Sequence, residues 1–410
     1  MPETSRIDAP EAFVQPRDLP RVTPREEGQG DHDYVEAWRA KGPVAVDRYG
    51  FFWTFSHAHM LVCTDPSLTR QVETETVRIR GITSGPIFRY FDSALLFANG
   101  RTHAARRRPL ARTFAFKLME GMRGPARDVT ESLVRPRLGE EIDFLGEVAG
   151  PLPARIIAAI LGIPEDDVPW FSTRVHSAMR TLGLRSDEVL AEAGASLAEL
   201  DDYVDALLAA RRIAPREDFL TEYARTVDDS DLTEDEVRAQ ITSVILAGAD
   251  TTRMALCSTF SQLLQHPEQW RALVADPDGL KAQAAAEGLR YDPVIGSLPR
   301  VATAEFALDG VRVPEGTVLS PIVLAALRDP AVYAEPTRFD IHREDHPRYH
   351  PVFGAGAHRC LGEALARAEL EEALAVLARE APGSELLRAP VLKGLSGARG
   401  IDAMRVRLAA

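Results

Sequence analysis

Cysteine is scarce in this sequence: the 410 residues include only Cys63, Cys257 and Cys360. Three cysteines in a chain of this length leave no disulfide framework and favour a reducing compartment, so we expect a cytoplasmic protein. Long apolar runs are also missing, and the longest, Ile241 to Ala249, is too short to cross a bilayer. Residues 1–30 are rich in Pro, Glu and Arg without an apolar segment, which predicts neither a signal peptide nor a membrane anchor.

Positive charge is in deficit. The chain has 48 Lys and Arg against 61 Asp and Glu, a net charge of -13 at pH 7. A negative protein is repelled by phosphate backbones, so this balance argues against nucleic acid as a partner. The sequence also has no G-x-G-x-x-G turn after a strand and no cysteine cluster, so it carries no recognisable flavin or iron–sulfur module.

Helical periodicity is what the sequence does have. Hydrophobic residues make up 45% of the chain, enough for a large core. We predict helices over 104–122, 125–137, 146–162, 185–212, 233–266 and 362–380, and short strands over 44–53, 306–313, 318–322 and 403–408. No linker separates two cores. We therefore predict an irregular segment over residues 1–30 and one mainly α domain with a small β region over residues 31–410.

The most informative stretch is FGAGAHRCLG, Phe353 to Gly362, which places Cys360 on a glycine-rich loop just before a predicted helix. We expect Gly354, Gly356 and Gly362 to let the backbone turn tightly. Unpaired N–H groups and the positive end of the helix dipole favour thiolate over thiol there. A lone thiolate suits the axial ligand of a haem iron better than zinc or iron–sulfur chemistry. The simpler alternative is a buried structural cysteine, the interpretation we favour for the other two.

This stretch resembles the haem-binding loop of the cytochrome P450 family, F-G-x-G-x-H/R-x-C-x-G, at every fixed position. Family-like segments extend over about the last three-quarters of the chain. The resemblance implies that residues 31–410 form a cytochrome P450 domain. Its heme b (iron protoporphyrin IX) would lie between a long central helix and the helix after the cysteine loop, with Cys360 as the metal ligand.

A second motif, Ala247-Gly-Ala-Asp-Thr-Thr252, lies in the middle of the predicted helix 233–266. A glycine costs a helix about 1 kcal/mol, and a buried acid needs a partner. Thr251 can hydrogen-bond a carbonyl one turn earlier and open the helix locally. The motif is similar to the family's A/G-G-x-D/E-T, which implies that Thr251 holds dioxygen and a water while Asp250 relays protons. A kinked helix with a satisfied Asp–Thr pair is the alternative.

Further residues match the family's structural positions. Glu287 and Arg290 share one helical face and resemble its E-x-x-R pair, which implies a structural ion pair joined by Arg338 or, preferably, Arg343. The resemblance also implies partners for the two haem propionates, since guanidinium and imidazole groups suit carboxylates. These cofactor-binding candidates are His103, Arg107, Arg300 and His358, although Arg106 to Arg108 could be only a basic surface.

The resemblance also suggests the substrate pocket and the electron donor. The pocket segments are apolar and aromatic, which predicts a small to medium hydrophobic or aromatic substrate. The candidate substrate-binding residues are Phe88, Tyr90, Phe91, Val244, Ala247 and Ile295. Because the chain has no redox module of its own, electrons must come from separate proteins. We expect an acidic ferredoxin to dock on a basic patch of Arg106, Arg108, Arg112, Lys117 and Arg359.

We therefore predict a monomeric monooxygenase that uses O2 to hydroxylate or O-dealkylate its substrate. Two alternatives stay open. The protein could be a haem-thiolate peroxygenase or dehydratase, although such relatives usually lack the acid–alcohol pair of Asp250 and Thr251. It could also be a non-catalytic haem-based sensor, although a sensor normally carries a DNA-binding or signalling module.

Overall fold

The computed structural model describes residues 14–114, 119, 121–182, 186–348 and 350–410, apart from the side chains of residues 112 and 113. Helices dominate these residues. They are α1 (Asp31–Arg39), α2 (His57–Cys63), α3 (Glu75–Arg78), α4 (Gly85–Ser93), α5 (Gly100–Thr113), α7 (Arg123–Val134), α8 (Pro151–Leu161), α9 (Val168–Ala178), α10 (Asp187–Ile213), α11 (Phe219–Asp228), α12 (Glu234–Gln265), α13 (Pro267–Ala275), α14 (Pro277–Tyr291), α15 (Val323–Ala326) and α16 (Glu363–Glu380).

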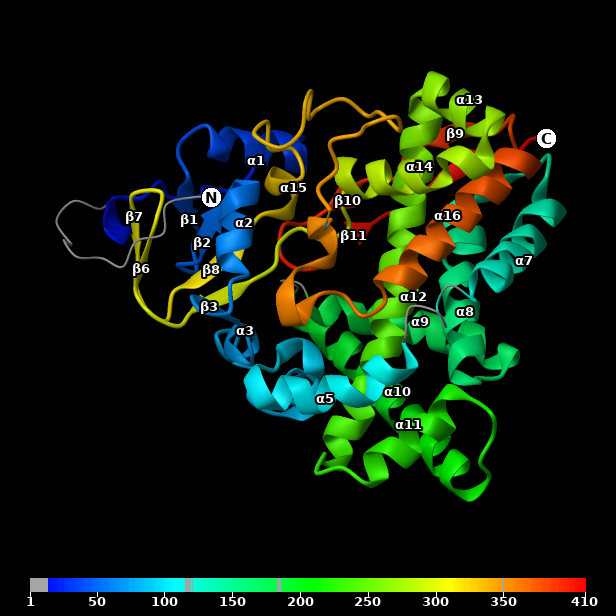
Figure 1. Cartoon of the computed structure of the whole chain (residues 1–410), viewed down its shortest axis with the longest axis horizontal. Helices are drawn as coiled ribbons and strands as arrows, with labels where there is room; N and C mark the ends of the chain where they lie inside the picture. Colours follow the sequence, from blue (N-terminus) through cyan, green and yellow to red (C-terminus); the bar gives the residue numbers. More distant parts are fainter. Residues whose placement is uncertain (1–13, 115–118, 120, 183–185, 349) are drawn as a thin grey trace.

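The strands are short and form small sheets. They are β1 (Val44–Val46), β2 (Phe52–Thr54), β3 (Thr69–Gln71), β4 (Glu141–Asp143), β5 (Arg300–Ala302), β6 (Phe306–Leu308), β7 (Val311–Val313), β8 (Val318–Pro321), β9 (Glu385–Arg388), β10 (Leu392–Lys393), β11 (Gly400–Ile401) and β12 (Arg405–Arg407). The largest described sheet has the order β1-β2-β8-β5-β3 and lies on the left in Figure 1 beside α1, α2 and α15, whereas long helices such as α12 and α16 lie on the right. The prediction of a mainly α fold with a small β region is confirmed.

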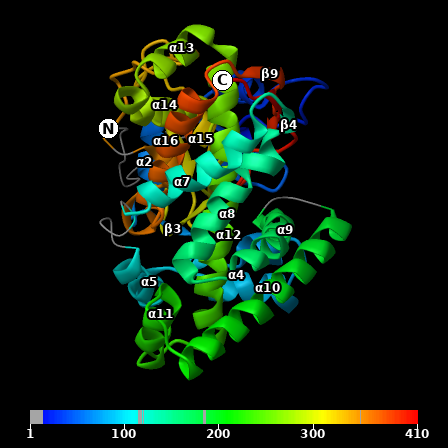
Figure 2. The same cartoon turned by 90° about the vertical axis from the view of Figure 1, so that its right-hand side faces the viewer.

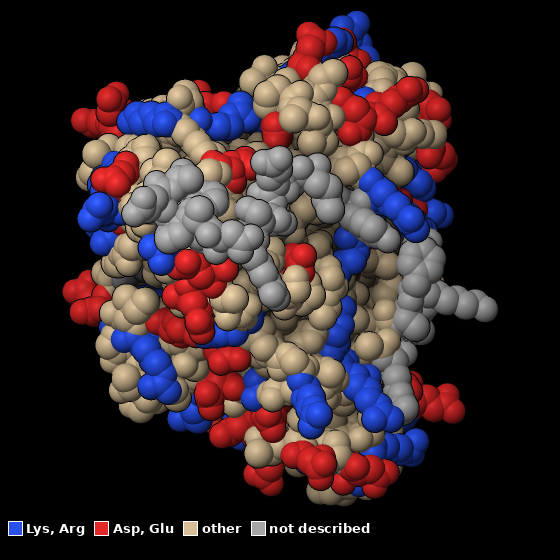
Figure 3. Space-filling model, turned by 60° about the vertical axis from the view of Figure 1, so that its left-hand side comes forward, with Lys and Arg blue, Asp and Glu red and all other residues tan. Residues whose placement is uncertain are grey.

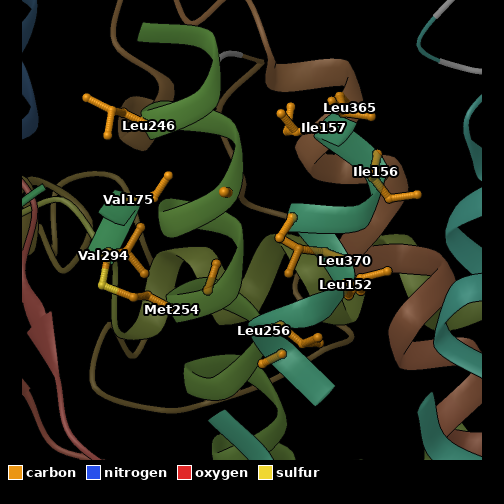
Figure 4. Close-up of a cluster of buried hydrophobic side chains, with 14 of the residues drawn as sticks. Leu152, Ile156, Ile157, Val175, Leu246, Met254, Leu256, Val294, Leu365 and Leu370 are labelled. Atoms are coloured by element: carbon orange, nitrogen blue, oxygen red, sulfur yellow. The ribbon is translucent and has the colours of Figure 1, made fainter. Parts of the chain in front are cut away.

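The long helix α12 runs through the middle of the molecule (Figure 2) and packs against α8, α10, α14 and α16. Figure 4 shows part of this core, where leucine and isoleucine side chains of α8, α12 and α16 meet. A capping box starts the helix: Thr233 Oγ1 accepts from the N–H of Glu236, and the Glu236 carboxylate accepts from the N–H of Thr233. Among the described residues, no helix has the length and apolar character that a membrane crossing requires.

The predicted helices are found, with shifted ends. The predicted segments 185–212, 233–266 and 362–380 match α10, α12 and α16 within two residues. The segment 146–162 is divided at Gly150 between a π-helical turn, Leu145–Ala149, and α8. The segment 125–137 begins two residues early as α7 and ends in a 3-10 turn, Arg135–Arg137. The segment 104–122 begins four residues late, because α5 begins at Gly100, and it continues past the end of α5, whose cap is Phe114. Residues 115–118 and 120 of the segment lie outside the described residues.

Two of the predicted strands are in fact hairpins. Within 44–53, the Asp47 carboxylate accepts from the N–H groups of Tyr49 and Phe51, so the chain turns back and β1 pairs with β2. Within 306–313, Asp309 and Gly310 have φ values of 45° and 77° and join β6 to β7. The predictions over 318–322 and 403–408 correspond to β8 and β12.

Candidate active site

The loop before α16 holds Cys360 by its backbone. The N–H of Cys360 donates to the Phe353 carbonyl at 2.8 Å, which closes the loop on itself. Gly354 and Gly356 have φ values of 71° and 61°, a conformation that residues with a side chain rarely adopt. Gly362 differs from expectation: its φ of -88° is ordinary, and a methyl group there would lie 4.0 Å from Cys360 Sγ. Gly362 therefore makes no sharp turn, and its backbone N–H forms a hydrogen bond to the Cys360 sulfur.

Cys360 is the accessible cysteine, whereas Cys63 and Cys257 are buried as predicted. Burial against protein atoms is the largest influence on the Cys360 thiol and raises its pKa; the Gly362 N–H and the charges of Arg107 and Arg359 act in the opposite direction. The N–H group at the helix start therefore favours thiolate as expected, but desolvation of the thiol outweighs this contribution. A bound metal ion reverses this balance, since it stabilises the coordinating thiolate directly.

Four basic side chains gather beside this loop, from α5, β5 and the loop itself. The rings of His103 and His358 lie 4.1 Å apart. Burial, then His103, Arg300 and Arg107, lower the pKa of His358 to about 3, so all four groups are close neighbours. Burial also lowers the pKa of Arg300 to about 10, and its guanidinium contacts the carbonyl of Pro299.

This basic set fits a dianionic ligand. His103 is 4% exposed, and its Nε2 has no hydrogen-bond partner among the described residues. A buried ring nitrogen without a hydrogen-bond partner is costly, so a partner from outside the chain is expected there. Arg107 donates to the Arg359 carbonyl at 2.8 Å, which ties α5 to the cysteine loop. Two carboxylates presented to this set would receive charge-assisted hydrogen bonds.

One face of α12 is accessible although the helix runs through the core. Along it Ala247 is exposed and Ser243, Val244, Gly248 and Thr251 are half-buried, while neighbouring positions such as Ile245 are buried. These positions recur every three to four residues and therefore form one stripe. A stripe of accessible residues in a central helix indicates that it lines the inside of a site.

The two predicted catalytic residues lie on α12. Thr251 Oγ1 donates to the Ala247 carbonyl at 2.8 Å, the backbone bond that its position predicts. Asp250 is 5% exposed and accepts from Arg253 at 2.5 Å. His176 of α9 lies 3.9 Å from the same carboxylate, and burial, then Arg253, lower its pKa to about 4. Asp250 is thus turned toward α9 and Arg253.

Sequence reasoning missed Arg253 and His176. Arg253 had a signal, because it follows Asp250 by three residues on one helical face. His176 had none, since its contact depends on how α9 packs against α12.

The pair Glu287 and Arg290 is buried and structural, as predicted. Arg290 donates to both carboxylate oxygens of Glu287, at 2.7 and 2.8 Å. Arg343 Nε lies 3.4 Å from Glu287, whereas Arg338 contributes only its carbonyl, which accepts from Arg290 at 2.8 Å. The preference for Arg343 over Arg338 is confirmed.

The candidate substrate-binding residues fall into different places. Val244 and Ala247 lie on the accessible face of α12, and Ile295 is half-buried in the segment after α14. The phenol of Tyr90 on α4 contacts Ser243 of that face at 3.2 Å. Phe91 stacks on Phe97 at 4.0 Å and is 4% exposed, which is typical of core. Phe88 lies under the guanidinium of Arg78, on the side of α4 toward α3.

These features fit a haem-thiolate enzyme. A haem needs a ligand for its iron, donors for its two carboxylates and an apolar surface for its ring. The accessible sulfur of Cys360 can serve as the iron ligand. Donors for the carboxylates are available from His103, Arg107, Arg300 and His358, and the accessible face of α12 offers the apolar surface. The residues present therefore suit the group that the sequence predicts.

Comparison with known proteins identifies the family. The family described as "Cytochrome P450" matches residues 187–278 and 280–380. The chain is 38% identical to "Cytochrome P450-pinF1, plant-inducible" of Rhizobium radiobacter over 382 residues, covering 92% of this chain and 90% of that protein. It is 32% identical over 358 residues to "Erythromycin C-12 hydroxylase" of Saccharopolyspora erythraea, covering 85% and 87%.

Solved structures agree. CxnD, described as the cytochrome P450 enzyme for C–S bond formation in chuangxinmycin biosynthesis, superposes with a TM-score of 0.84 at 28% identity, covering 96% of this chain and 98% of that one. CalO2 gives a TM-score of 0.83 at 28% identity, covering 91% and 94%. The chain belongs to the cytochrome P450 family. It is a haem monooxygenase with heme b as its cofactor.

Proposed function

We propose that this monooxygenase hydroxylates or O-dealkylates a small to medium hydrophobic or aromatic molecule, with electrons from a separate ferredoxin and its reductase. The observation that carries the substrate class is the accessible face of α12, where Val244 and Ala247 present only apolar groups. Similarity to the erythromycin C-12 hydroxylase supports hydroxylation as the reaction.

The protein residues divide the work around the cofactor. When bound through the Cys360 thiolate, haem supplies the activation of O2. His103, Arg107, Arg300 and His358 bind the propionates and fix the ring. Thr251 holds a proton at its hydroxyl, directed to the Ala247 carbonyl until a ligand offers a better acceptor. Asp250 moves protons from solvent toward Thr251, and its carboxylate must leave Arg253 to do so.

The substitution Thr251→Ala tests the proton-delivery role. The variant should keep haem and substrate binding but divert NAD(P)H consumption into hydrogen peroxide, because the hydroxyl that directs protons is missing. Product, peroxide and NAD(P)H are measured together. Thr252→Ala is the control, since Thr252 is buried away from the accessible face and should stay coupled. Full coupling in Thr251→Ala would contradict the role.

We infer that the ferredoxin docks where α5 meets the cysteine loop. Arg108 is exposed there, and Arg359 and Arg367 both pair with Glu363 at the start of α16. The predicted patch needs one correction: Arg106 is 7% exposed and binds Glu236 at 2.8 Å, so it belongs to the core.

The side chain of Arg112 and residue Lys117, which also belong to the predicted patch, lie outside the described part of the chain.

The charge of the surface allows such a patch. On the face shown in Figure 3 charges of both signs are interspersed, and basic side chains gather in a band over its right-hand half. A net charge of -13 therefore leaves room for a locally basic surface that an acidic protein could approach.

The variant Arg108→Glu tests this docking site. Reversing the charge of this exposed residue should slow the reduction of the haem by an acidic ferredoxin several-fold at low salt. The difference should disappear at high salt. Stopped-flow reduction over a salt series measures it. Arg405→Glu, an exposed arginine of β12, is the control for overall charge. An unchanged rate for Arg108→Glu would refute the site.

We also propose that the protein works as a monomer in the cytoplasm. The described cysteines are all free thiols, which suits a reducing compartment. Light scattering of the purified holoprotein tests the oligomeric state, and cell fractionation tests the compartment.

A further inference from the structure

A buried histidine connects the start of the cysteine loop to α14. His350 is 3% exposed, and its Nε2 lies 3.3 Å from the carbonyl oxygen of Ala286 in α14. Its Nδ1 lies 3.4 Å from the backbone nitrogen of Val352, where it caps the 3-10 turn Pro351–Phe353. The carbonyl of the last residue of this turn accepts from the N–H of Cys360. His350 therefore supports the same piece of backbone that holds the cysteine.

The two partners of His350 require a neutral ring. The Ala286 carbonyl can only accept, so Nε2 donates to it. The Val352 N–H can only donate, so Nδ1 accepts from it. Only the neutral imidazole with its proton on Nε2 makes both hydrogen bonds. A second proton on Nδ1 would face the Val352 N–H, donor against donor, and the cap of the turn would be lost.

The surroundings of His350 also exclude a positive charge. Burial is the largest influence, and with Arg367 of α16, His346 and Arg290 of α14 it lowers the pKa of His350 well below its usual value. The carbonyl of Ala286 acts in the opposite direction. Positive groups thus approach the ring from α14, from α16 and from the segment before the loop, so a protonated His350 would be repelled from three sides.

The acidic groups of this region are already paired. Glu287 accepts from Arg290 through both carboxylate oxygens, at 2.7 and 2.8 Å, and Asp345 pairs with Arg343 at 3.0 Å. Glu287 also lies 3.7 Å from His346 Nε2, whose ring is 6.1 Å from that of His350. These carboxylates therefore compensate the neighbouring cations and leave little negative charge for a further proton.

We propose that His350 is a positioning residue for the cysteine loop: its neutral ring holds the loop against α14, and a proton taken up from solvent at Nδ1 releases the loop and with it the thiolate ligand Cys360. This inference rests on Cys360 as the iron ligand and goes beyond the proposed reaction. The folded protein holds this proton less tightly than the open loop does. The loop is therefore fully stable above about pH 6.5 and loses stability as the pH falls below that value.

Amide substitutions test the proposal in purified holoprotein. The strongly red-shifted Soret band of the reduced carbon monoxide complex reports thiolate ligation, and the rate at which it is lost is measured at pH 5 and pH 7.5. The ratio of the two rates is the acid factor. His350→Gln can still donate to the Ala286 carbonyl, and His350→Asn can still accept from the Val352 N–H, but neither titrates. One proton over about 1.5 pH units corresponds to about 30-fold, so both variants should have acid factors about 10- to 30-fold smaller than wild type.

Two further measurements separate this role from a general effect of acid. His342→Gln replaces an exposed histidine of the same segment and should keep the wild-type acid factor. Hydrogen exchange of the wild-type holoprotein needs no substitution. After correction for the intrinsic effect of pH, the amides of residues 350–362 should exchange up to about 30-fold faster at pH 5 than at pH 7.5. The amides of residues 366–378 in α16 should change little.

The outcomes distinguish this inference from the function. With the red-shifted band present at pH 7.5, equal acid factors for wild type and the amide variants would overturn the inference. Unchanged exchange of residues 350–362 at pH 5 would do the same, even where the amide variants fail to bind haem. Absence of the band from the wild type at pH 7.5 would instead contradict the haem-thiolate function on which the inference rests.

Discussion

The two sides of the haem site are built in different ways. On the cysteine side, ten consecutive residues form a loop closed by a backbone bond between Cys360 and Phe353. On the substrate side, α4 and α12 meet through side chains about 150 positions apart in the chain: Gln240 binds the backbone of Ser93 and Leu95, and Ser243 meets Tyr90. The proposed iron ligand is thus positioned by local sequence, whereas the proposed substrate side depends on how distant helices pack.

The largest expected effect is on the cysteine side. Cys360→Ser should abolish the red-shifted Soret band of the reduced carbon monoxide complex and all monooxygenase activity, because a hydroxyl is a poor replacement for the thiolate ligand. Cys63→Ala is the control, since Cys63 is buried at the end of α2, where it packs in a cluster with residues of the β-strands. It should keep the spectrum and lose only some stability. A normal spectrum for Cys360→Ser would show that Cys360 is not the iron ligand, and the contrast between the two sides would no longer hold.

A smaller effect tests the basic set beside the loop. Arg300→Gln removes a proposed charged partner of the haem carboxylates and should weaken haem binding roughly 10- to 100-fold, the range of one charge-assisted hydrogen bond. Transfer of haem to excess apomyoglobin measures the loss. Arg106→Gln is the matched control: it breaks the pair with Glu236 and should lower the free energy of unfolding while leaving haem transfer unchanged. The reverse pattern would show that Arg300 is only structural.

The sequence predicts the cysteine side better than the substrate side for a physical reason. The loop, the capping box of Thr233 and Glu236, and the partnership of Glu287 with Arg343 follow from short-range spacing and family motifs. Arg106 looked like a surface residue because its partner, Glu236, lies 130 positions away. His176 carried no signal at all. Such contacts depend on how helices pack, and packing is not visible in local periodicity.

A charged group on the substrate side should give a pH-dependent effect on stability. Burial raises the pKa of Asp201 from 3.8 to about 6, with Thr242, Arg238 and Arg89 acting against it. The folded state therefore holds this proton more tightly than the unfolded state, and its stabilising contribution is complete below pH 3.8 and lost as the pH rises through about 6.

The substitution Asp201→Asn should remove this loss. About two pKa units correspond to roughly 3 kcal/mol at most, so between pH 4 and 7 the variant should lose up to that much less stability than wild type. Urea unfolding at both pH values measures the difference. Asp202→Asn changes the exposed acid next to Asp201 in α10 and should follow the wild type. If Asp201→Asn and the wild type lose the same free energy of unfolding between pH 4 and 7, Asp201 is not desolvated.

The smallest expected effect is a difference in stability between alanine substitutions at two glycines near the substrate side. At Gly194 of α10 an added methyl would lie 3.4 Å from Ile87, an ordinary contact, so Gly194→Ala should gain up to about 1 kcal/mol of helix propensity. At Gly248 of α12 the methyl would lie 2.7 Å from Ile157 Cγ1 and closer still to Cδ1. There the overpacking cost of about 1–3 kcal/mol should cancel or exceed the same gain. Chemical unfolding of both variants measures the contrast. An equal gain in stability for both variants would mean that Ile157 moves aside freely and that α12 tolerates a larger residue as well as α10 does.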